Sequence, residues 1–293
     1  SNIIPYLRLM HILDLRSVGW IQLDTFATVK ESSKKTTSEI ELETNFMNLQ
    51  PLNDIIKSQK FTILSFDLEC TSGDKISFPN PEKPTDKVIQ IGLSLSRYGE
   101  DECYAKYILT LGGCTKLEGI DVRCYDTEEE LLLAFSRLIV ELDPDIITGY
   151  NIFGFDFKYL YMRAKLLNIE HKFSRLSRIK NLCCEFIESK LASSALGENI
   201  LKYYKMPGRI VFDLMKVVQR DHKLDSWKLD HVAHHFLKQN KNDVSPQDIF
   251  RLQKGTAADR AIIAAYCVQD CALCNLLTIK LEILANNMGM SNV

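Results

Sequence analysis

The spacing of apolar residues changes near residue 127, and this change limits the fold more than any other feature of the chain. Before it lie three runs with the composition of β-strands: KFTILSFDLEC (60–70), KVIQIGLSLS (87–96) and CYAKYILTL (103–111). From Thr127 onward, apolar residues recur at the helical period of about 3.6 residues. A short strand-like run (145–150) and a second helical pattern (about 155–168) follow. This order predicts an α/β fold with a mixed sheet.

Local signals define the ends of the first predicted helix. Thr127 and Glu130 have the spacing of a capping box, in which each side chain bonds the other residue's backbone N–H at a helix start. Proline disfavours helical geometry in the residue before it, so the Asp143-Pro144 pair ends the helix. Upstream, LRLMHILDL (7–15) and WIQLDTF (20–26) alternate as strands do, and the polar stretch KESSKKTTSE (30–39) predicts an exposed loop or hairpin tip.

Three acidic side chains lie at or after the ends of predicted strands. Asp67 and Glu69 lie at the end of the first strand and point to the same face, because side chains alternate along a strand. Asp156 follows a Gly-Tyr-Asn turn between a strand and a helix, which is where open α/β sheets collect ligands. Neighbouring carboxylates repel each other unless a cation neutralises them, and hard oxygen ligands suit Mg²⁺ or Mn²⁺. Solvated acids at a strand end and an ordinary helix cap remain alternatives at this point.

The segment YCVQDCALC (266–274) has two incompatible interpretations. Its thiols have the C-x3-C-x2-C spacing of radical-enzyme iron–sulfur loops, whereas Tyr266 and Asp270 stand four residues apart, as on one face of a helix. The surrounding run from Ala257 contains no glycine or proline and is compatible with a helix throughout. Free cysteine packs as a small buried hydrophobe. We therefore favour a helix with a cysteine core stripe, which delivers Tyr266 and Asp270 to a site elsewhere.

Composition and charge narrow the class of protein. A hydrophobic content of 46% with 25% charged residues is typical of a globular protein with a substantial core. No apolar run approaches the roughly 20 residues of a membrane-spanning helix, and nine scattered cysteines favour a reducing, intracellular protein. The net charge is −2, yet residues 158–223 hold 14 Lys and Arg against 6 Asp and Glu, a local balance of +8. Such a stretch is either a solvated face or a surface that follows a phosphate backbone.

Three motifs together resemble those of a known family. FDLE (66–69), YNIFGFD (150–156) and YCVQD (266–270) are similar, in sequence and in order, to the exonuclease motifs of family B DNA polymerases. Further stretches resemble the delta-type enzymes of eukaryotes and the polymerases of large DNA viruses: DPDIITGYNI (143–152), GRIVFDLMKVV (208–218) and SWKLDHVAHHFL (226–237). The resemblance covers roughly residues 60–293, while residues 1–59 resemble the end of a preceding, β-rich N-terminal domain. The palm motifs of the polymerase domain are absent.

The resemblance implies a ribonuclease H-like exonuclease fold and proofreading chemistry, in which water cleaves the 3′-terminal phosphodiester of DNA and releases nucleoside monophosphates. Two Mg²⁺ ions, for which Mn²⁺ can substitute, would be held by the carboxylates of the three motifs. By analogy Asp67 bridges both ions, Glu69 and Asp270 complete one site, and Asp156 helps to hold the other. Tyr266 would orient the attacking water, because a phenol is a poor base at neutral pH.

The same resemblance implies the substrate side and the partners. Asn151, Phe155 and Lys228 would bind the terminal nucleotides, and a hairpin within about residues 190–210 would help to part primer from template. The partners would be a single-stranded 3′ end, primer-template DNA, a polymerase domain in cis and a processivity factor, with no membrane involved. The location would be the nucleus for a cellular protein, or a cytoplasmic replication site for a cytoplasmic DNA virus.

Other functions and sites fit less of the sequence. A non-catalytic single-stranded-DNA-binding module is the main alternative, and a free-standing RNA exonuclease is a third, although all four acids and the tyrosine are present. His231 and His235 have the i, i+4 spacing of a zinc site but lack an evident third ligand. The adjacent Cys183 and Cys184 are interpreted as structural residues. Asp213 is interpreted as a hydrogen-bonding support or a substrate-side residue rather than a metal ligand.

Overall fold

A six-stranded mixed sheet forms the centre of the computed structural model, which describes residues 4–55, 57–193, 197–239 and 244–291. The strand order is β12-β9-β5-β6-β7-β8, with bounds β5 (Thr62–Cys70), β6 (Val88–Arg97), β7 (Cys103–Leu111), β8 (Asp121–Tyr125), β9 (Ile146–Thr148) and β12 (Ile210–Val211). The pairs β5–β6 and β6–β7 are antiparallel, whereas β9 joins β5 and β12 in parallel and β8 joins β7 in parallel. The predicted mixed α/β sheet is confirmed, and it contains the strands predicted at 60–70, 87–96, 103–111 and 145–150.

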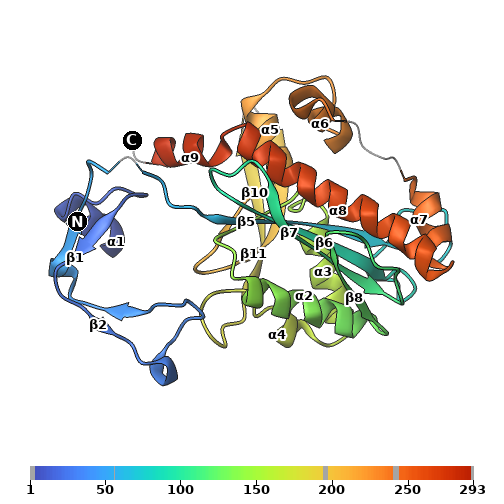
Figure 1. Ribbon diagram of the computed structural model, residues 1–293, viewed down its shortest axis with the longest axis horizontal. Helices are drawn as coiled ribbons and strands as arrows, with labels where there is room; N and C mark the ends of the chain where they lie inside the picture. Colours follow the sequence, from blue (N-terminus) through green and yellow to red (C-terminus); the bar gives the residue numbers. More distant parts are fainter. Residues whose placement is uncertain (1–3, 56, 194–196, 240–243, 292–293) are drawn as a thin grey trace.

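Helices cover both faces of this sheet (Figure 1). One face carries α2 (Glu128–Leu142), α3 (Asp156–Leu166) and the short α4 (Glu170–Phe173), and the other carries the long α8 (Ala257–Lys280). The predicted capping box is present at the start of α2, and Asp143 ends that helix with a φ of 43° just before Pro144. The main core lies between the sheet and α2 and α3, where the ring of Phe66 packs against those of Phe135 and Phe157 at 5.4 and 5.2 Å.

The helix α8 lies on a strip of small and polar side chains. The Ser65 hydroxyl donates to the Cys271 carbonyl at 2.5 Å, and the Asn275 amide donates to the Ser94 carbonyl at 2.9 Å. By length and composition α8 is the one described helix that could cross a membrane, contrary to the expectation that no apolar run is long enough. Half of its residues are buried, however, and it packs along β5, β6 and β7, so its apolar character is that of a core helix.

Further helices and a hairpin complete the part of the chain after residue 60. These are α5 (Leu214–Asp221), α6 (Leu229–Leu237), α7 (Pro246–Gln253), α9 (Ile283–Ser291) and the antiparallel hairpin of β10 (Glu185–Ser193) with β11 (Gly197–Lys205). The predicted hairpin is present, but it spans 185–205 rather than 190–210. Its first strand begins directly after Cys184, a buried residue of the core.

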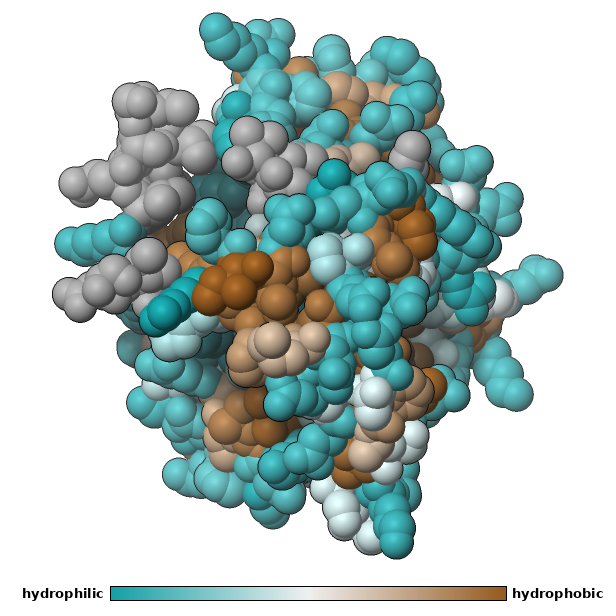
Figure 2. All heavy atoms as spheres, turned by 90° about the vertical axis from the view of Figure 1, so that its left-hand side faces the viewer, coloured by the Kyte–Doolittle hydropathy of each residue, from teal (hydrophilic) through white to brown (hydrophobic). Residues whose placement is uncertain are grey.

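The N-terminal segment has little core of its own. It contains α1 (Pro5–Ile12), β1 (Ile21–Leu23), β2 (Ala27–Thr28), η1 (Glu31–Ser33), β3 (Leu42–Glu43), η2 (Phe46–Asn48) and β4 (Leu49–Pro51), in two-stranded pairs β1–β4 and β2–β3. The strand predicted at residues 7–15 is wrong, because Pro5 at the first turn starts a helix there. No described residue before 61 is buried, and Figure 2, which views this side of the molecule, shows apolar side chains gathered at its centre. The polar stretch 30–39 connects the paired strands β2 and β3, as a hairpin connection would.

Candidate metal centre at the end of β5

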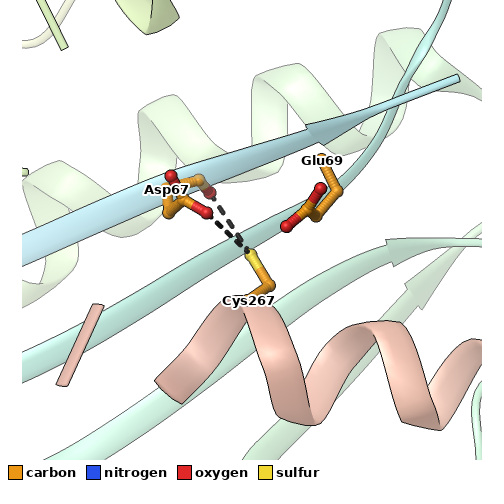
Figure 3. Close-up of side chains that lie close together, drawn as sticks. All are labelled: Asp67, Glu69 and Cys267. Carbon is orange, nitrogen blue, oxygen red and sulfur yellow. Dashed lines mark hydrogen bonds between the residues drawn. The ribbon is translucent and has the colours of Figure 1, made fainter. Parts of the chain in front are cut away.

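Asp67 and Glu69 project from β5 toward α8 (Figure 3). Leu68 between them is buried in the main core on the opposite face. The Cys267 thiol of α8 faces both acids, and its ligand atom lies within 4.8 Å of theirs. This thiol contacts the Asp67 carbonyl at 3.5 Å and one Asp67 carboxylate oxygen at 3.9 Å. The predicted shared face of the two carboxylates is therefore present, and it is closed on one side by α8.

Asp156 is the first residue of α3, and its side chain is only 2% exposed. The turn before it runs close to β5, because a Cβ on Gly149 would lie 2.5 Å from the Phe66 carbonyl oxygen. Asn151 within this turn takes a left-handed conformation with φ of 62°. The glycine thus allows the strand-to-helix turn to bring Asp156 alongside the end of β5.

Asp270 and Tyr266 lie one turn apart on α8, as the i, i+4 spacing predicts. Asp270 is buried at 6% exposure, whereas Tyr266 is half-buried and packs against the cluster that contains Ile89 and Ile249. The iron–sulfur interpretation fails here. Cys267, Cys271 and Cys274 lie on a continuous helix, buried in the core, and not in a loop that could turn three thiolates toward one cluster.

Electrostatic repulsion links the four carboxylates. Burial raises the pKa of Asp67 well above its ordinary value, and the negative charges of Glu69, Asp156 and Asp270 raise it further. Burial, with a contribution from Asp213, raises the pKa of Asp156 to about 8. Buried, neighbouring carboxylates can all ionise only when a cation neutralises their charge. A set of oxygen ligands fits a hard divalent ion. The Cys267 thiol beside these acids is a soft ligand that suits such an ion less well, and burial raises the pKa of this thiol well above its ordinary value.

Asp213 organises the turn that carries Asp156. Its carboxylate accepts hydrogen bonds from the backbone N–H groups of Asn151 at 3.0 Å, Phe153 at 3.0 Å and Met215 at 2.9 Å. The side chain is 1% exposed and caps α5, so its two oxygens connect the start of that helix to the turn after β9. This is the hydrogen-bonding support that the sequence suggested, although nothing in the sequence indicated which amides it bonds.

The expected substrate-side residues lie around the same turn. Phe155 packs against Tyr159 and against Phe78, whose ring centroid is 5.4 Å away and whose side chain is 76% exposed. Phe78 lies on the loop after β5 and was missed in the sequence, where nothing distinguishes it from a core aromatic residue. Lys228 is exposed at the start of α6, next to Trp227, whose carbonyl accepts a 2.6 Å hydrogen bond from Tyr150.

The two histidines with zinc spacing form no site within the described residues. His231 and His235 lie on α6, and the ring of His235 packs against Phe236 at 4.7 Å. The group of potential ligands that the described residues bring together is that of Asp67, Glu69 and Cys267. Cys183 and Cys184 are free thiols in the described structure, consistent with a packing role.

Comparison with known proteins finds relatives of this chain among DNA polymerases. The family model described as "DNA polymerase family B, exonuclease domain" matches residues 1–232. A DNA polymerase of Pyramimonas orientalis virus is 42% identical over 92% of this chain and 28% of its own length. The DNA polymerase delta catalytic subunits of Dictyostelium discoideum and Arabidopsis thaliana are 40% and 38% identical over the whole chain and 26% and 27% of their own lengths. The chain thus spans about a quarter of the length of these relatives.

Proposed function

Because the chain belongs to the exonuclease-domain family of the family B DNA polymerases, we propose that it is a proofreading exonuclease, which removes nucleotides from the 3′ end of DNA. The observation that carries this proposal is the grouping of buried acids at the end of β5, where the negative charges of Glu69, Asp156 and Asp270 raise the pKa of Asp67. A divalent cation can neutralise such a group. Tyr266 and Asp270 lie beyond the residues that the family model matches. Their assignment therefore rests on their place on α8.

Four side chains would hold the metal ions. Asp67 and Glu69 would hold the ions from β5, Asp270 from α8 and Asp156 from the start of α3. Two divalent ions, Mg²⁺ or Mn²⁺, would supply an activated water and neutralise the charge that develops on the phosphate and the leaving oxygen. The chain itself contributes fixed carboxylates, since β5, α3 and α8 are all anchored in the core.

The substrate strand would approach over the loop after β5. The ring of Phe78 is exposed beside Phe155, and an exposed aromatic face can stack on any base, which is worth roughly 1–3 kcal/mol per base. Asn151 in the turn before Phe155 and the exposed Lys228 at the start of α6 would supply the polar contacts to the terminal nucleotides. Such stacking has no sequence preference, and a proofreading enzyme needs this property because it must remove any mispaired base.

The direct test is digestion of a 5′-labelled single-stranded DNA with Mg²⁺ or with EDTA, alongside Asp67→Ala/Glu69→Ala. We expect a metal-dependent ladder that shortens from the 3′ end and is lost in the double variant. Metal-independent cleavage, or cleavage that survives in the double variant, would overturn the proposal. DNA binding without any cleavage would favour the alternative, a non-catalytic DNA-binding module.

Tyr266→Phe is expected to lower the single-turnover cleavage rate by roughly tenfold to a hundredfold, because the variant loses the hydroxyl that orients water but keeps the ring packing. The affinity for DNA, measured in EDTA, should change little. A variant that cleaves at the wild-type rate would show that the hydroxyl has no part in the reaction.

Metal binding should also appear as a pH-dependent gain in stability. The pKa of Asp156 is about 8 in the fold against 3.8 ordinarily, so the folded chain binds more protons than the unfolded one between these values. Stability of the metal-free protein therefore falls as pH rises through this window. Millimolar Mg²⁺ should raise the melting temperature more at pH 8 than at pH 5, as measured by calorimetry. Equal shifts at both pH values, or the same shifts in Asp67→Ala/Glu69→Ala, would contradict a metal site at these acids.

The setting of this activity follows from the relatives. They are DNA polymerases about four times as long, so we propose that the site receives a primer end from a polymerase domain of the same chain. Primer-template DNA and a processivity factor would be its other partners, at an intracellular site of replication, in the nucleus or in a cytoplasmic viral compartment.

A further inference from the structure

A basic cavity of about 540 Å³ lies on the outer side of α2 and α4, away from the metal centre. The side chains of Arg137, Lys172, Arg175 and Lys180 line it, and none of its described lining residues is acidic. Asp67 and Glu69 face α8 on one side of the sheet, whereas the cavity is lined by residues of α2, of α4 and of the loop after α4, and α2 covers the other face of the sheet. The cavity is therefore not part of the candidate metal centre.

Most of these positive charges lack a protein partner. Within the described part of the chain, Arg137, Lys172 and Arg175 form no ion pair, whereas Lys180 contacts Glu31 at 3.7 Å. Like charges gathered around one cavity repel each other, and an anion that enters it relieves that repulsion. Three of the four cations belong to the stretch 158–223 with its local charge of +8. The cavity shows where part of that excess charge is concentrated.

The wall of the cavity is held in place by neighbouring hydrogen bonds. The Ser136 hydroxyl donates to the Phe173 carbonyl at 2.8 Å and so fixes α2 against α4. In the loop that follows, the Ser177 hydroxyl hydrogen-bonds the backbone of Ile179. Arg178 forms ion pairs with Asp143 at 3.0 Å and with Asp145, just before β9, at 2.8 Å. The cations on this loop and on α4 are therefore presented by a fixed backbone.

The N-terminal segment closes the cavity on one side. The backbone N–H of Thr37 donates to the Arg178 carbonyl at 2.7 Å, and the N–H of Lys180 donates to the Lys35 carbonyl at 2.8 Å. A β-bridge pairs Thr36 with Ile179, so the polar connection 30–39 docks on the exonuclease part through its backbone. The sequence predicted an exposed connection here, and its composition gave no sign of this docking.

We propose that this cavity binds phosphate groups of a single DNA strand at a distance from the metal centre. Its volume lies in the range of sites for nucleotide-sized ligands, and Leu133, Val140 and Ile179 provide apolar surface for sugar and base between the cations. The cations are spread over α2, α4 and the following loop, which suits successive phosphates of a strand. Binding there does not require cleavage, so it can be tested independently of the proposed exonuclease activity.

The test compares Lys172→Ala/Arg175→Ala with a control, Lys116→Ala/Lys280→Ala, which removes the same charge from exposed positions elsewhere. Fluorescence anisotropy in EDTA measures binding of an oligothymidylate of about 16 nucleotides across a range of salt concentrations. Each lost phosphate contact lowers the slope of log K against log salt by about 0.7, so the cavity variant should lose about 1.4 and the control much less. Arg175→Glu should weaken binding as well.

Substrate length provides the second measurement. A thymidylate trinucleotide, cleaved in Mg²⁺, engages the metal centre alone, and its turnover should be equal in the wild type, the cavity variant and the control. Equal slopes in the cavity variant and the control would overturn the proposal. So would loss of binding to thymidine monophosphate in the cavity variant with unchanged affinity for the long strand, because the cavity would then serve free nucleotides. Absence of trinucleotide cleavage in all proteins would count against the proposed function and leave the binding result intact.

Discussion

Asp156→Asn is expected to lower the exonuclease rate by about a thousandfold or more and, at the same time, to stabilise the metal-free protein at pH 8. Loss of about 4 kcal/mol of transition-state stabilisation is a thousandfold in rate, which is a modest demand on a residue that helps to hold a catalytic metal ion. The substitution keeps the size and shape of the side chain. The loss of activity should therefore reflect the lost negative charge rather than a changed fold.

The gain in stability follows from burial. Asp156 is 2% exposed and its pKa is raised to about 8, so the fold opposes its ionisation at every pH between its ordinary value and 8. A neutral asparagine avoids this penalty and keeps an oxygen that can accept from the Leu68 backbone N–H. A gain of about 2 kcal/mol would raise the melting temperature by roughly 5 °C at pH 8. The gain should shrink toward pH 4, where the aspartic acid is protonated.

Asp213→Asn is the matched control, because Asp213 is equally buried and burial also raises its pKa. Both of its oxygens accept backbone hydrogen bonds, from Asn151, Phe153 and Met215. An asparagine retains one acceptor and directs an NH₂ group at a backbone N–H, so the control should lose about 1–3 kcal/mol of stability. Melting curves with and without Mg²⁺ measure both effects. A stability loss in Asp156→Asn of the size seen in Asp213→Asn would show that Asp156 is structural.

Much of the fold could be predicted because its signals are local. The strands at 62–70, 88–97 and 103–111 and the helix at 128–142 follow from residue spacing, a capping box and Pro144. The shared face of Asp67 and Glu69 follows from strand alternation, and that of Tyr266 and Asp270 from helix periodicity. In each case the information lies within a few residues of chain.

The remainder depends on contacts between distant segments. Asp213 bonds an amide 62 residues away, and Cys267 meets Asp67 across 200 residues of sequence. In the helix at 5–12, apolar and polar residues alternate over a few positions, as they do in a strand. A segment this short does not distinguish the period of a strand from that of a helix. The docking of residues 35–37 on 178–180 uses backbone groups, which leave no mark on composition.

Gly92→Val is expected to reduce exonuclease activity by about a hundredfold and stability by about 3 kcal/mol, although Gly92 carries no functional group. A Cβ at this position would lie 2.8 Å from the Cys267 sulfur and 3.1 Å from the Cys267 carbonyl oxygen. Valine therefore forces α8 away from β6. Because α8 carries Tyr266 and Asp270 while β5 carries Asp67, the displacement separates the two halves of the metal centre.

A double-mutant cycle distinguishes this displacement from a general loss of packing. Gly92→Ala introduces only the Cβ, and Cys267→Ala removes the sulfur that this Cβ would meet first. Each single variant should be destabilised, while the combined variant should recover part of the loss, with a coupling of about 1 kcal/mol or more. The melting temperature gives stability, and the Mg²⁺-induced shift in that temperature reports whether Asp270 has returned to the site. Strictly additive effects would show that the close approach of α8 to Gly92 does not hold the metal centre together.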